Sequence, residues 1–140
     1  MTGQDATALL HEAMPLCATL GVRADKYAAD EVVLTLDWAP ALCTTGGILH
    51  GGAIMAVADS AGAACAFLNL PKDASGTATI ESKTNFFAPG VVGTKVTGEC
   101  LPLHRGKRTM AWQTRITNEA GRLIALVTQT QMVLEPRSSA

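Results

Sequence analysis

A glycine-rich stretch in the first half of the chain carries the residues best suited to chemistry. The run Gly46-Gly47-Ile48-Leu49-His50-Gly51-Gly52 leads directly into an almost entirely apolar segment that continues to Leu68. Glycines let the backbone turn tightly and approach a ligand closely. A helix that begins here would direct unpaired N–H groups and a partial positive charge at whatever lies in front of it. The stretch therefore predicts a ligand site at a helix N-terminus.

A single carboxylate, Asp59, lies within the apolar segment, seven residues after Gly52. A carboxylate in a buried apolar helix is costly unless it is hydrogen-bonded or faces a cavity. Asp59 is therefore either a structural residue, paired with a backbone amide or a lysine, or a catalytic nucleophile or base. The glycine-rich turn upstream favours the catalytic role, because the two features together supply an oxyanion donor and an attacking group.

The spacing of Gly51 and Asp59 sets a condition on any shared site. One reacting carbon needs both groups within about 3 Å, whereas eight residues of helix span about 12 Å. Two antiparallel copies of the helix, side by side, would bring Gly51 of one chain to Asp59 of the other. The sequence thus predicts a site at a subunit interface, present twice in a dimer.

The elements that must position these residues follow from periodicity and turn residues. A single domain over 1–140 is expected to contain an amphipathic helix over 5–17, ended or kinked at Pro15, and a polar tail over 135–140. Alternating residues and turn signals predict strands over 22–29, 31–38, 77–87, 94–103, 108–117 and 122–134. In the strand over 108–117, one face is predicted to carry Met110, Trp112, Thr114 and Ile116; in the last strand, one face is predicted to carry Ile124, Leu126, Thr128, Thr130 and Met132.

Short turns between these strands imply an antiparallel sheet, and a helix that is apolar nearly all round must be covered on every side. We therefore expect an α+β fold in which a sheet curls around the helix over 53–68 and a second subunit covers the rest. The helix is long enough to span a membrane, but it is rich in Ala and Gly and contains Asp59, so a helix buried in protein is expected instead.

Composition narrows the function classes. A net charge of −1 and an aromatic content of 4% argue against a nucleic-acid partner. The four cysteines lack C-x-x-C spacing and the three histidines are scattered, so reduced thiols and no metal site are expected. No basic, apolar leader precedes the first helix, and we expect a cytoplasmic protein with neither a membrane partner nor a cofactor.

Three motifs resemble those of hotdog-fold acyl-CoA thioesterases of the PaaI-like, phenylacetic-acid-degradation type. They are Leu49-His50-Gly51-Gly52, the pair Ala58-Asp59 and the later run Asn85-Phe86-Phe87-Ala88-Pro89. The resemblance extends from about residue 16 to residue 134. It implies an antiparallel sheet of five to six strands wrapped around the central helix, dimers that pair their sheets edge to edge, and assembly into a homotetramer.

The resemblance also implies roles for individual residues. Gly51 matches the position whose backbone N–H polarises the thioester carbonyl, and His50 matches the motif histidine that shapes the loop and assists polarisation. Asp59 matches the catalytic carboxylate, as nucleophile or as general base on water. Thr79 matches a hydroxyl-bearing strand position that holds the water in some members. Where some relatives carry asparagine or glutamine six residues before the histidine, this chain has Thr44, which has a shorter reach.

Further residues are expected to contact the substrate. Gly52 belongs to the same loop, and Met55, Leu42 and the Phe86-Phe87 pair could shape an acyl pocket for aromatic or medium-chain groups. The basic run that contains Arg105, Lys107 and Arg108 is either a solvated hairpin tip or a clamp for the phosphates of coenzyme A. Similar proteins place this turn near the nucleotide, which favours the clamp.

Two other functions remain open at this level. A hotdog hydratase or dehydratase would use a histidine and a carboxylate to move a proton and water on an acyl thioester, and no such pair is evident in the sequence. A non-catalytic acyl-binding protein would retain Asp59 only for structure. Ser60 lies within the expected helix and lacks the first glycine of a G-x-S-x-G elbow, so it is not expected to be a nucleophile.

Overall fold

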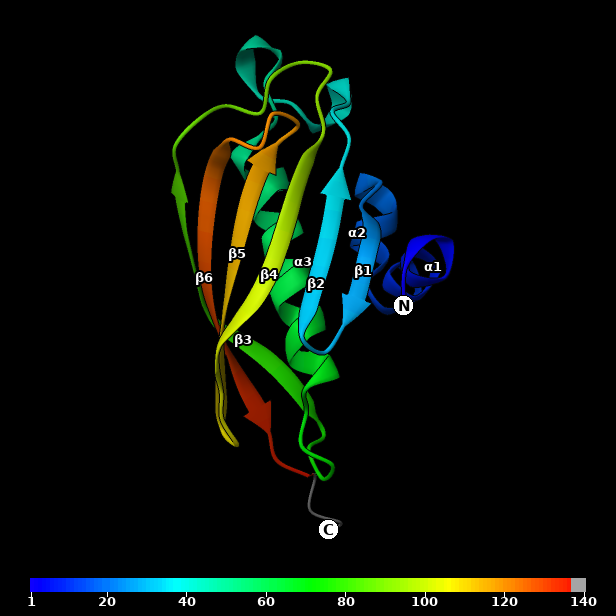
Figure 1. Ribbon diagram of the computed structural model, residues 1–140, viewed down its shortest axis with the longest axis vertical. Helices are drawn as coiled ribbons and strands as arrows, with labels where there is room; N and C mark the ends of the chain where they lie inside the picture. The colour runs from blue at the N-terminus through cyan, green and yellow to red at the C-terminus, as the bar shows by residue number, and fades with distance from the viewer. Residues whose placement is uncertain (137–140) are drawn as a thin grey trace.

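One long helix, α3, runs through the centre of the computed structural model, which describes residues 1–136 (Figure 1). A six-stranded sheet curves around this helix, and two short helices lie beside the first strand. The elements, in chain order, are α1 (Gly3–Ala13), α2 (Pro15–Leu20), β1 (Arg23–Ala28), β2 (Glu31–Leu36), η1 (Pro40–Leu42), η2 (Thr45–Gly47), α3 (Gly51–Leu68), β3 (Gly76–Phe86), β4 (Val96–Arg105), β5 (Thr109–Asn118) and β6 (Leu123–Leu134).

The strands lie in the order β1-β2-β4-β5-β6-β3, and every neighbouring pair is antiparallel. This agrees with the expected antiparallel sheet. Alternate residues of the central strands face α3: Met110, Trp112 and Ile116 of β5 are buried, as the period-2 pattern of that strand predicted. The core therefore lies between the concave face of the sheet and one side of the helix.

A β-bulge in β6 changes which residues face the helix. Thr117 pairs with Leu123 while Ile116 pairs with Ala125, so Ile124 is the extra residue. Ile124 and Ala125 are both buried, and the alternation restarts one residue later than the sequence predicted. The predicted grouping is correct for Leu126, Thr128, Thr130 and Met132, which share the outer side of the strand, and wrong for Ile124, which the bulge places inside. The inward residues are Ala125, Val127, Gln129 and Gln131.

The predicted helix over 5–17 is two helices in the structure. Met14 leaves the helical region, with φ −133° and ψ 87°, because the residue before a proline is disfavoured there. Pro15 then opens α2, where its missing N–H costs nothing. Of the predicted tail over 135–140, residues 137–140 lie outside the described part of the chain.

One stripe of α3 is left exposed by the chain itself. Gly52, Met55, Asp59 and Phe67 are the exposed residues of this helix, while half of it is buried against the sheet. By length and composition α3 could cross a membrane, but its contacts with β1 to β6 make it the core helix, as predicted. The position of Asp59 differs from the expectation, because its side chain lies on the exposed stripe rather than among the buried residues.

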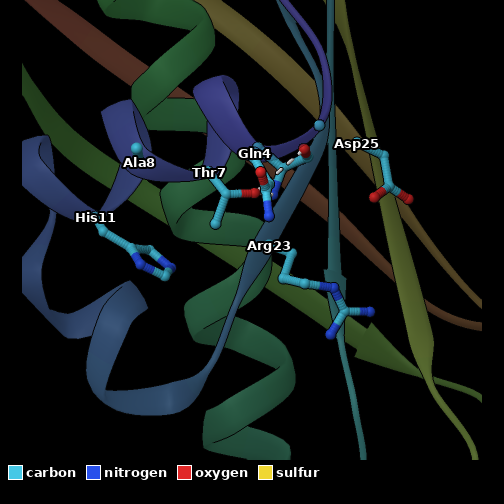
Figure 2. Close-up of a pocket in the computed structure, with 8 residues that line it drawn as sticks. Gln4, Thr7, Ala8, His11, Arg23 and Asp25 are labelled. Carbon is cyan, nitrogen blue, oxygen red and sulfur yellow. Dashed lines mark hydrogen bonds between the residues drawn. The ribbon is translucent and has the colours of Figure 1, made fainter.

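The two edge strands of the sheet, β1 and β3, have different surroundings. The free edge of β1 is covered by α1: the Thr7 hydroxyl accepts from the Ala24 N–H at 3.0 Å, and His11 Nε2 lies 2.7 Å from the Val22 carbonyl oxygen. Figure 2 shows these side chains in the cleft between α1 and β1. Thr7 and His11 contact backbone groups at and just before β1, so α1 covers this edge of the sheet. At the other side of the sheet, β3 pairs with β6 alone.

Candidate active site

The His50-Gly51-Gly52 run forms the N-terminus of α3 through one local hydrogen bond. His50 is the N-cap residue, and its Nδ1 accepts from the Gly52 N–H at 2.8 Å. A Cβ at position 52 would lie 2.9 Å from the same nitrogen, so only glycine fits beneath the ring. Because Nδ1 accepts, a neutral His50 ring carries its hydrogen on Nε2. The motif histidine therefore shapes the turn that presents Gly51.

Gly51 is the first helical residue, and its N–H makes no hydrogen bond to another of residues 1–136. A Cβ here would lie 3.1 Å from the ring of Phe86 at the end of β3. The cleft beside Gly51 is also lined by Thr44 and Leu49, so the structure brings Thr44 and Gly51 together. An unpaired N–H at a helix N-terminus is a ready donor to a carbonyl oxygen or an anion.

Asp59 lies two turns further along α3, beside β3. Its Oδ1 accepts from the Thr79 hydroxyl at 3.3 Å and from Gln129 Nε2 at 3.0 Å. The carboxylate lines an open cleft of about 270 Å³ together with Met55 and Ser82. The structure thus brings together Asp59 and Thr79, two of the residues singled out in the sequence, and adds Gln129.

Gln129 and Gln131 are site residues that the sequence analysis missed. Both are 1% exposed and lie on the inward face of β6. Gln131 Nε2 donates to the Thr79 hydroxyl at 2.7 Å, so both glutamines belong to the hydrogen-bond network around Asp59. Two glutamines at alternate positions of a strand could have suggested them, but strict alternation from a buried Ile124 would place them on the outer face, and only the bulge turns them inward.

Gly51 and Asp59 of one chain do not meet. The helix between them is continuous, so eight residues separate them by about 12 Å. They also line different clefts: Gly51 lines the cleft with Thr44, and Asp59 lines the cleft with Met55. In a single chain the Gly51 N–H and the Asp59 carboxylate therefore lie apart, as two candidate half-sites along α3.

The basic turn lies at the other end of the helix (Figure 1). Arg105 Nη1 donates to Asn69 Oδ1 at 3.2 Å, directly after the C-terminus of α3. Lys107 and Arg108 line a separate cleft beside Pro71. Asn69 lies ten residues beyond Asp59, about 15 Å along the helix. The three basic residues are thus close to each other in the fold and remote from Gly51.

The residues expected to shape an acyl pocket are distributed over three clefts around the first half of α3. Leu42 lines an apolar cleft with Leu16, Leu20 and Ala53; Met55 lines the Asp59 cleft and Phe86 the Gly51 cleft. Phe87 is 55% exposed. These side chains are therefore not gathered in one cleft of a single chain.

The cysteines lie outside the Asp59 network. Burial raises the pKa of Cys17, whose thiol donates to Ser60 Oγ at 3.2 Å, so Ser60 has a structural partner. Hydrogen bonding to Cys100 and burial raise the pKa of Cys65. Cys43 is half-buried, and its Sγ lies within hydrogen-bond distance of the carbonyl oxygens of Ala39, at 3.3 Å, and Gly47, at 3.4 Å. Within residues 1–136, no three His, Cys, Asp or Glu side chains are grouped as a metal site would require.

Comparison with known proteins identifies the family. The model of the thioesterase superfamily matches residues 46–125, more than half of the chain and the whole region from the glycine-rich loop into β6. The chain belongs to the thioesterase superfamily. This confirms the predicted family and enzyme class, a thioester hydrolase.

Curated relatives carry names of the same kind. “Putative esterase Rv1847” of Mycobacterium tuberculosis is 30% identical over 122 residues, which are 86% of this chain and 87% of that protein. The 1,4-dihydroxy-2-naphthoyl-CoA hydrolase of Escherichia coli is 34% identical over 88 residues, which are 63% of each chain. Both alignments place this thioesterase-superfamily chain among proteins named as hydrolases of esters or thioesters.

Solved structures confirm the hotdog fold. The Mycobacterium tuberculosis esterase superposes with a TM-score of 0.84 at 28% identity, over 89% of this chain and all of the other. A variant of the phenylacetic acid degradation protein PaaI of Thermus thermophilus superposes with a TM-score of 0.79 at 26% identity, over 86% and 99% of the two chains. The six-stranded antiparallel sheet around α3 is thus the fold of these proteins.

Proposed function

We propose that this thioesterase-superfamily chain hydrolyses acyl-CoA thioesters, with Asp59 as the catalytic carboxylate. The observation that carries the proposal is the setting of Asp59. Its carboxylate is the one acidic group of α3, it lies on the exposed stripe, and it lines a cleft beside the hydroxyl of Thr79. A carboxylate held at one oxygen in an open cleft is suited to attack a carbonyl carbon or to activate water.

The reaction uses both half-sites. The Gly51 N–H donates to the carbonyl oxygen of the thioester, and this hydrogen bond strengthens as negative charge develops there. Asp59 either takes a proton from the attacking water or attacks the carbon itself, which gives an anhydride that water then opens. In both routes the C–S bond breaks, the coenzyme A thiolate leaves, and the free acid is released. Thr79 holds the carboxylate or the attacking water.

A dimer would join the half-sites, and the sheet edges favour one arrangement. The β1 edge is covered by α1, whereas β3 is an eleven-residue strand with one partner and an exposed Ile80. An uncovered strand edge is a template for pairing with a second chain. We infer that two copies pair their β3 strands about a two-fold axis near Met55, which is midway between Gly51 and Asp59 on α3.

Contacts along β3 support this arrangement. The Thr79 end of the strand is bonded to Asp59, while the ring of Phe86 at the other end packs on Gly51. An antiparallel β3 pair centred between these two residues would set Thr79 of one chain opposite Phe86 of its partner. Asp59 of one subunit would then approach Gly51 of the other, and two equivalent sites would form. The homotetramer implied by the resemblance would be built from two such dimers.

Coenzyme A is proposed to extend from this site toward the basic turn. Arg105 contacts Asn69, which lies about 15 Å beyond Asp59 along the helix direction, a span comparable with the pantetheine arm of coenzyme A. Lys107 and Arg108 belong to the same turn between β4 and β5. Guanidinium and ammonium groups are the usual protein donors to phosphate. We therefore assign these residues to the nucleotide phosphates. Gly52 and Thr44 would contact the thioester end, where the Thr44 hydroxyl occupies the position of a longer amide in relatives.

The acyl group is proposed to be aromatic or of medium chain length. Met55 lines the Asp59 cleft, Phe86 lines the Gly51 cleft, and Leu42 lines the neighbouring apolar cleft. One relative is named for an aromatic substrate, 1,4-dihydroxy-2-naphthoyl-CoA. A substrate panel should therefore include that thioester, simpler aryl-CoAs and aliphatic acyl-CoAs.

The test is thiol release from this panel by the wild-type protein and by Asp59→Asn. We expect hydrolysis by the wild type and a loss of about 10³-fold in the variant, because the attacking group is removed. Asp25→Asn, which changes an exposed aspartate on β1, serves as the matched control and should retain full activity. Undiminished hydrolysis by Asp59→Asn would refute the proposal, and a change in unsaturation without thiol release would indicate a hydratase.

A further inference from the structure

Two buried glutamines connect the sheet to the proposed catalytic carboxylate. Gln129 and Gln131 are each 1% exposed and lie at alternate positions of β6, facing α3. Burying a carboxamide costs free energy unless its N–H and C=O groups are hydrogen-bonded. Within residues 1–136, the hydrogen-bond partners of these two amides are hydroxyl groups of β3 and Asp59 itself. The hydrogen bonds of Gln129 and Gln131 are thus directed at Asp59 and at the β3 hydroxyl groups beside it.

Gln129 holds Asp59 directly. Its Nε2 donates to Asp59 Oδ1 at 3.0 Å and to the Asp59 backbone oxygen at 3.2 Å. Its Oε1 accepts from the Ser82 hydroxyl at 2.9 Å, which fixes the amide with its nitrogen toward the carboxylate. A Cβ on Gly62 would lie 2.8 Å from Nε2, so the glycine in α3 gives the amide its room.

Gln131 acts on Thr79. Its Nε2 donates to the Thr79 hydroxyl at 2.7 Å, and its Oε1 accepts from the Thr77 hydroxyl at 3.2 Å. A hydroxyl has one hydrogen to donate. Because Gln131 already supplies a hydrogen to Thr79, the hydroxyl hydrogen of Thr79 is free to point at Asp59 Oδ1, 3.3 Å away. Gln131 therefore fixes the direction in which Thr79 donates.

The hydrogen bonds from Thr79 and from Gln129 end on the same carboxylate oxygen of Asp59. Thr79 and Gln129 donate to Oδ1, and Oδ2 accepts no side-chain hydrogen bond from the described residues. One oxygen of Asp59 is thus anchored, the other has no such partner, and Asp59 lines the open cleft. A reacting group held by neighbours in this way loses rotational freedom before the reaction begins.

We propose that Gln129 and Gln131 are positioning residues of the thioesterase reaction, which orient Asp59 and Thr79 so that Oδ2 of the carboxylate reacts. This inference rests on the proposed catalytic role of Asp59. The glutamines do not touch the substrate. They act through Asp59 and Thr79, so their loss should lower kcat and leave the KM of the acyl-CoA nearly unchanged.

The experiment measures kcat and KM for Gln129→Met and Gln131→Met, which keep side-chain length and remove the amide. We expect Gln129→Met to lower kcat about 100-fold and Gln131→Met about tenfold, with KM changed less than about twofold. Gln113→Met makes the same replacement on the outer face of β5 and should match the wild type. A rise in KM with kcat unchanged would overturn the proposal.

A double-mutant cycle separates positioning from general damage to the fold. If Gln131 acts only through Thr79, the double variant Gln131→Met/Thr79→Val should be no slower than Thr79→Val alone. If the two substitutions lower kcat by factors that multiply, they act independently, and the proposal that Gln131 acts through Thr79 is contradicted. Where Gln129→Met does not fold, Ser82→Ala removes the bond that fixes the same amide, and several-fold lower kcat is expected.

The outcomes also distinguish this inference from the proposed function. An inactive Asp59→Asn protein together with fully active glutamine variants would refute the positioning role and leave the proposed reaction intact. An active Asp59→Asn protein would refute the catalytic role, and the positioning role would fail with it. Thiol release from the same acyl-CoA is the readout throughout.

Discussion

At the scale of single residues, His50 has a role that the local structure explains. Its ring caps α3 through the Gly52 N–H, and the absence of a side chain at Gly52 makes room for the ring. The cap fixes the first turn of the helix and therefore the direction of the Gly51 N–H. The His-Gly-Gly order thus follows from the geometry of one helix N-terminus.

This role predicts a difference between two substitutions of His50. His50→Ala removes the cap and should lower the free energy of unfolding by about 1 kcal/mol, whereas His50→Asn supplies another N-cap acceptor and should remain close to the wild type. If His50 acts by shaping the turn, His50→Asn should also retain most of the hydrolytic activity. Urea denaturation and thiol release measure the two effects, and a stable but inactive His50→Asn protein would assign chemistry to the ring.

At the scale of elements, the β4–β5 turn is separated from the rest of the site by the length of α3. Arg105 is anchored to Asn69 at the C-terminal end of the helix, and Lys107 and Arg108 are exposed. A role in phosphate binding therefore concerns the nucleotide part of the substrate alone.

Substrates of different length test this role. Lys107→Ala and Arg108→Ala should each raise the KM for acyl-CoA about tenfold and leave kcat unchanged, since a charge-assisted contact to phosphate is lost. The same variants should hydrolyse the matching acyl-pantetheine thioester like the wild type, because that substrate lacks the nucleotide. Arg115→Ala, an exposed arginine in the middle of β5, is the control. Equal effects on both substrates would contradict a phosphate clamp.

At the scale of the whole molecule, the two half-sites of one chain predict complementation between inactive variants. Gly51→Pro removes the proposed oxyanion donor at a position where proline suits a helix, and the preceding His50 is already extended. The ring of Phe86, which lies against this position, is exposed enough to adjust. Asp59→Asn removes the carboxylate. Each variant alone should be inactive.

Mixed dimers of these two variants should regain activity. One of the two interface sites then combines an intact Gly51 with an intact Asp59, so random assembly should restore roughly a quarter of the wild-type rate. Co-refolded mixtures, assayed for thiol release and sized by light scattering, give the measurement. The absence of any recovery in a mixture shown to contain mixed dimers would place both groups of a site in the same chain.

The sequence by itself determined the features that depend on residues close together in the chain. Pro15 interrupts the N-terminal helix through the backbone of Met14, and the cap of α3 joins residues only two apart. The alternation in β5 also predicted its buried face, because no bulge interrupts the strand between Met110 and Ile116. These outcomes require no information about distant parts of the chain.

Only the tertiary structure decided the surroundings of Asp59. The bulge at Ile124 arises from pairing with β5, and it turns Gln129 and Gln131 inward, which strict alternation could not predict. The exposed stripe of α3 likewise depends on how far the sheet reaches around the helix. A side chain's local sequence sets its chemistry, but its burial and partners depend on strand register, which is a property of the folded sheet.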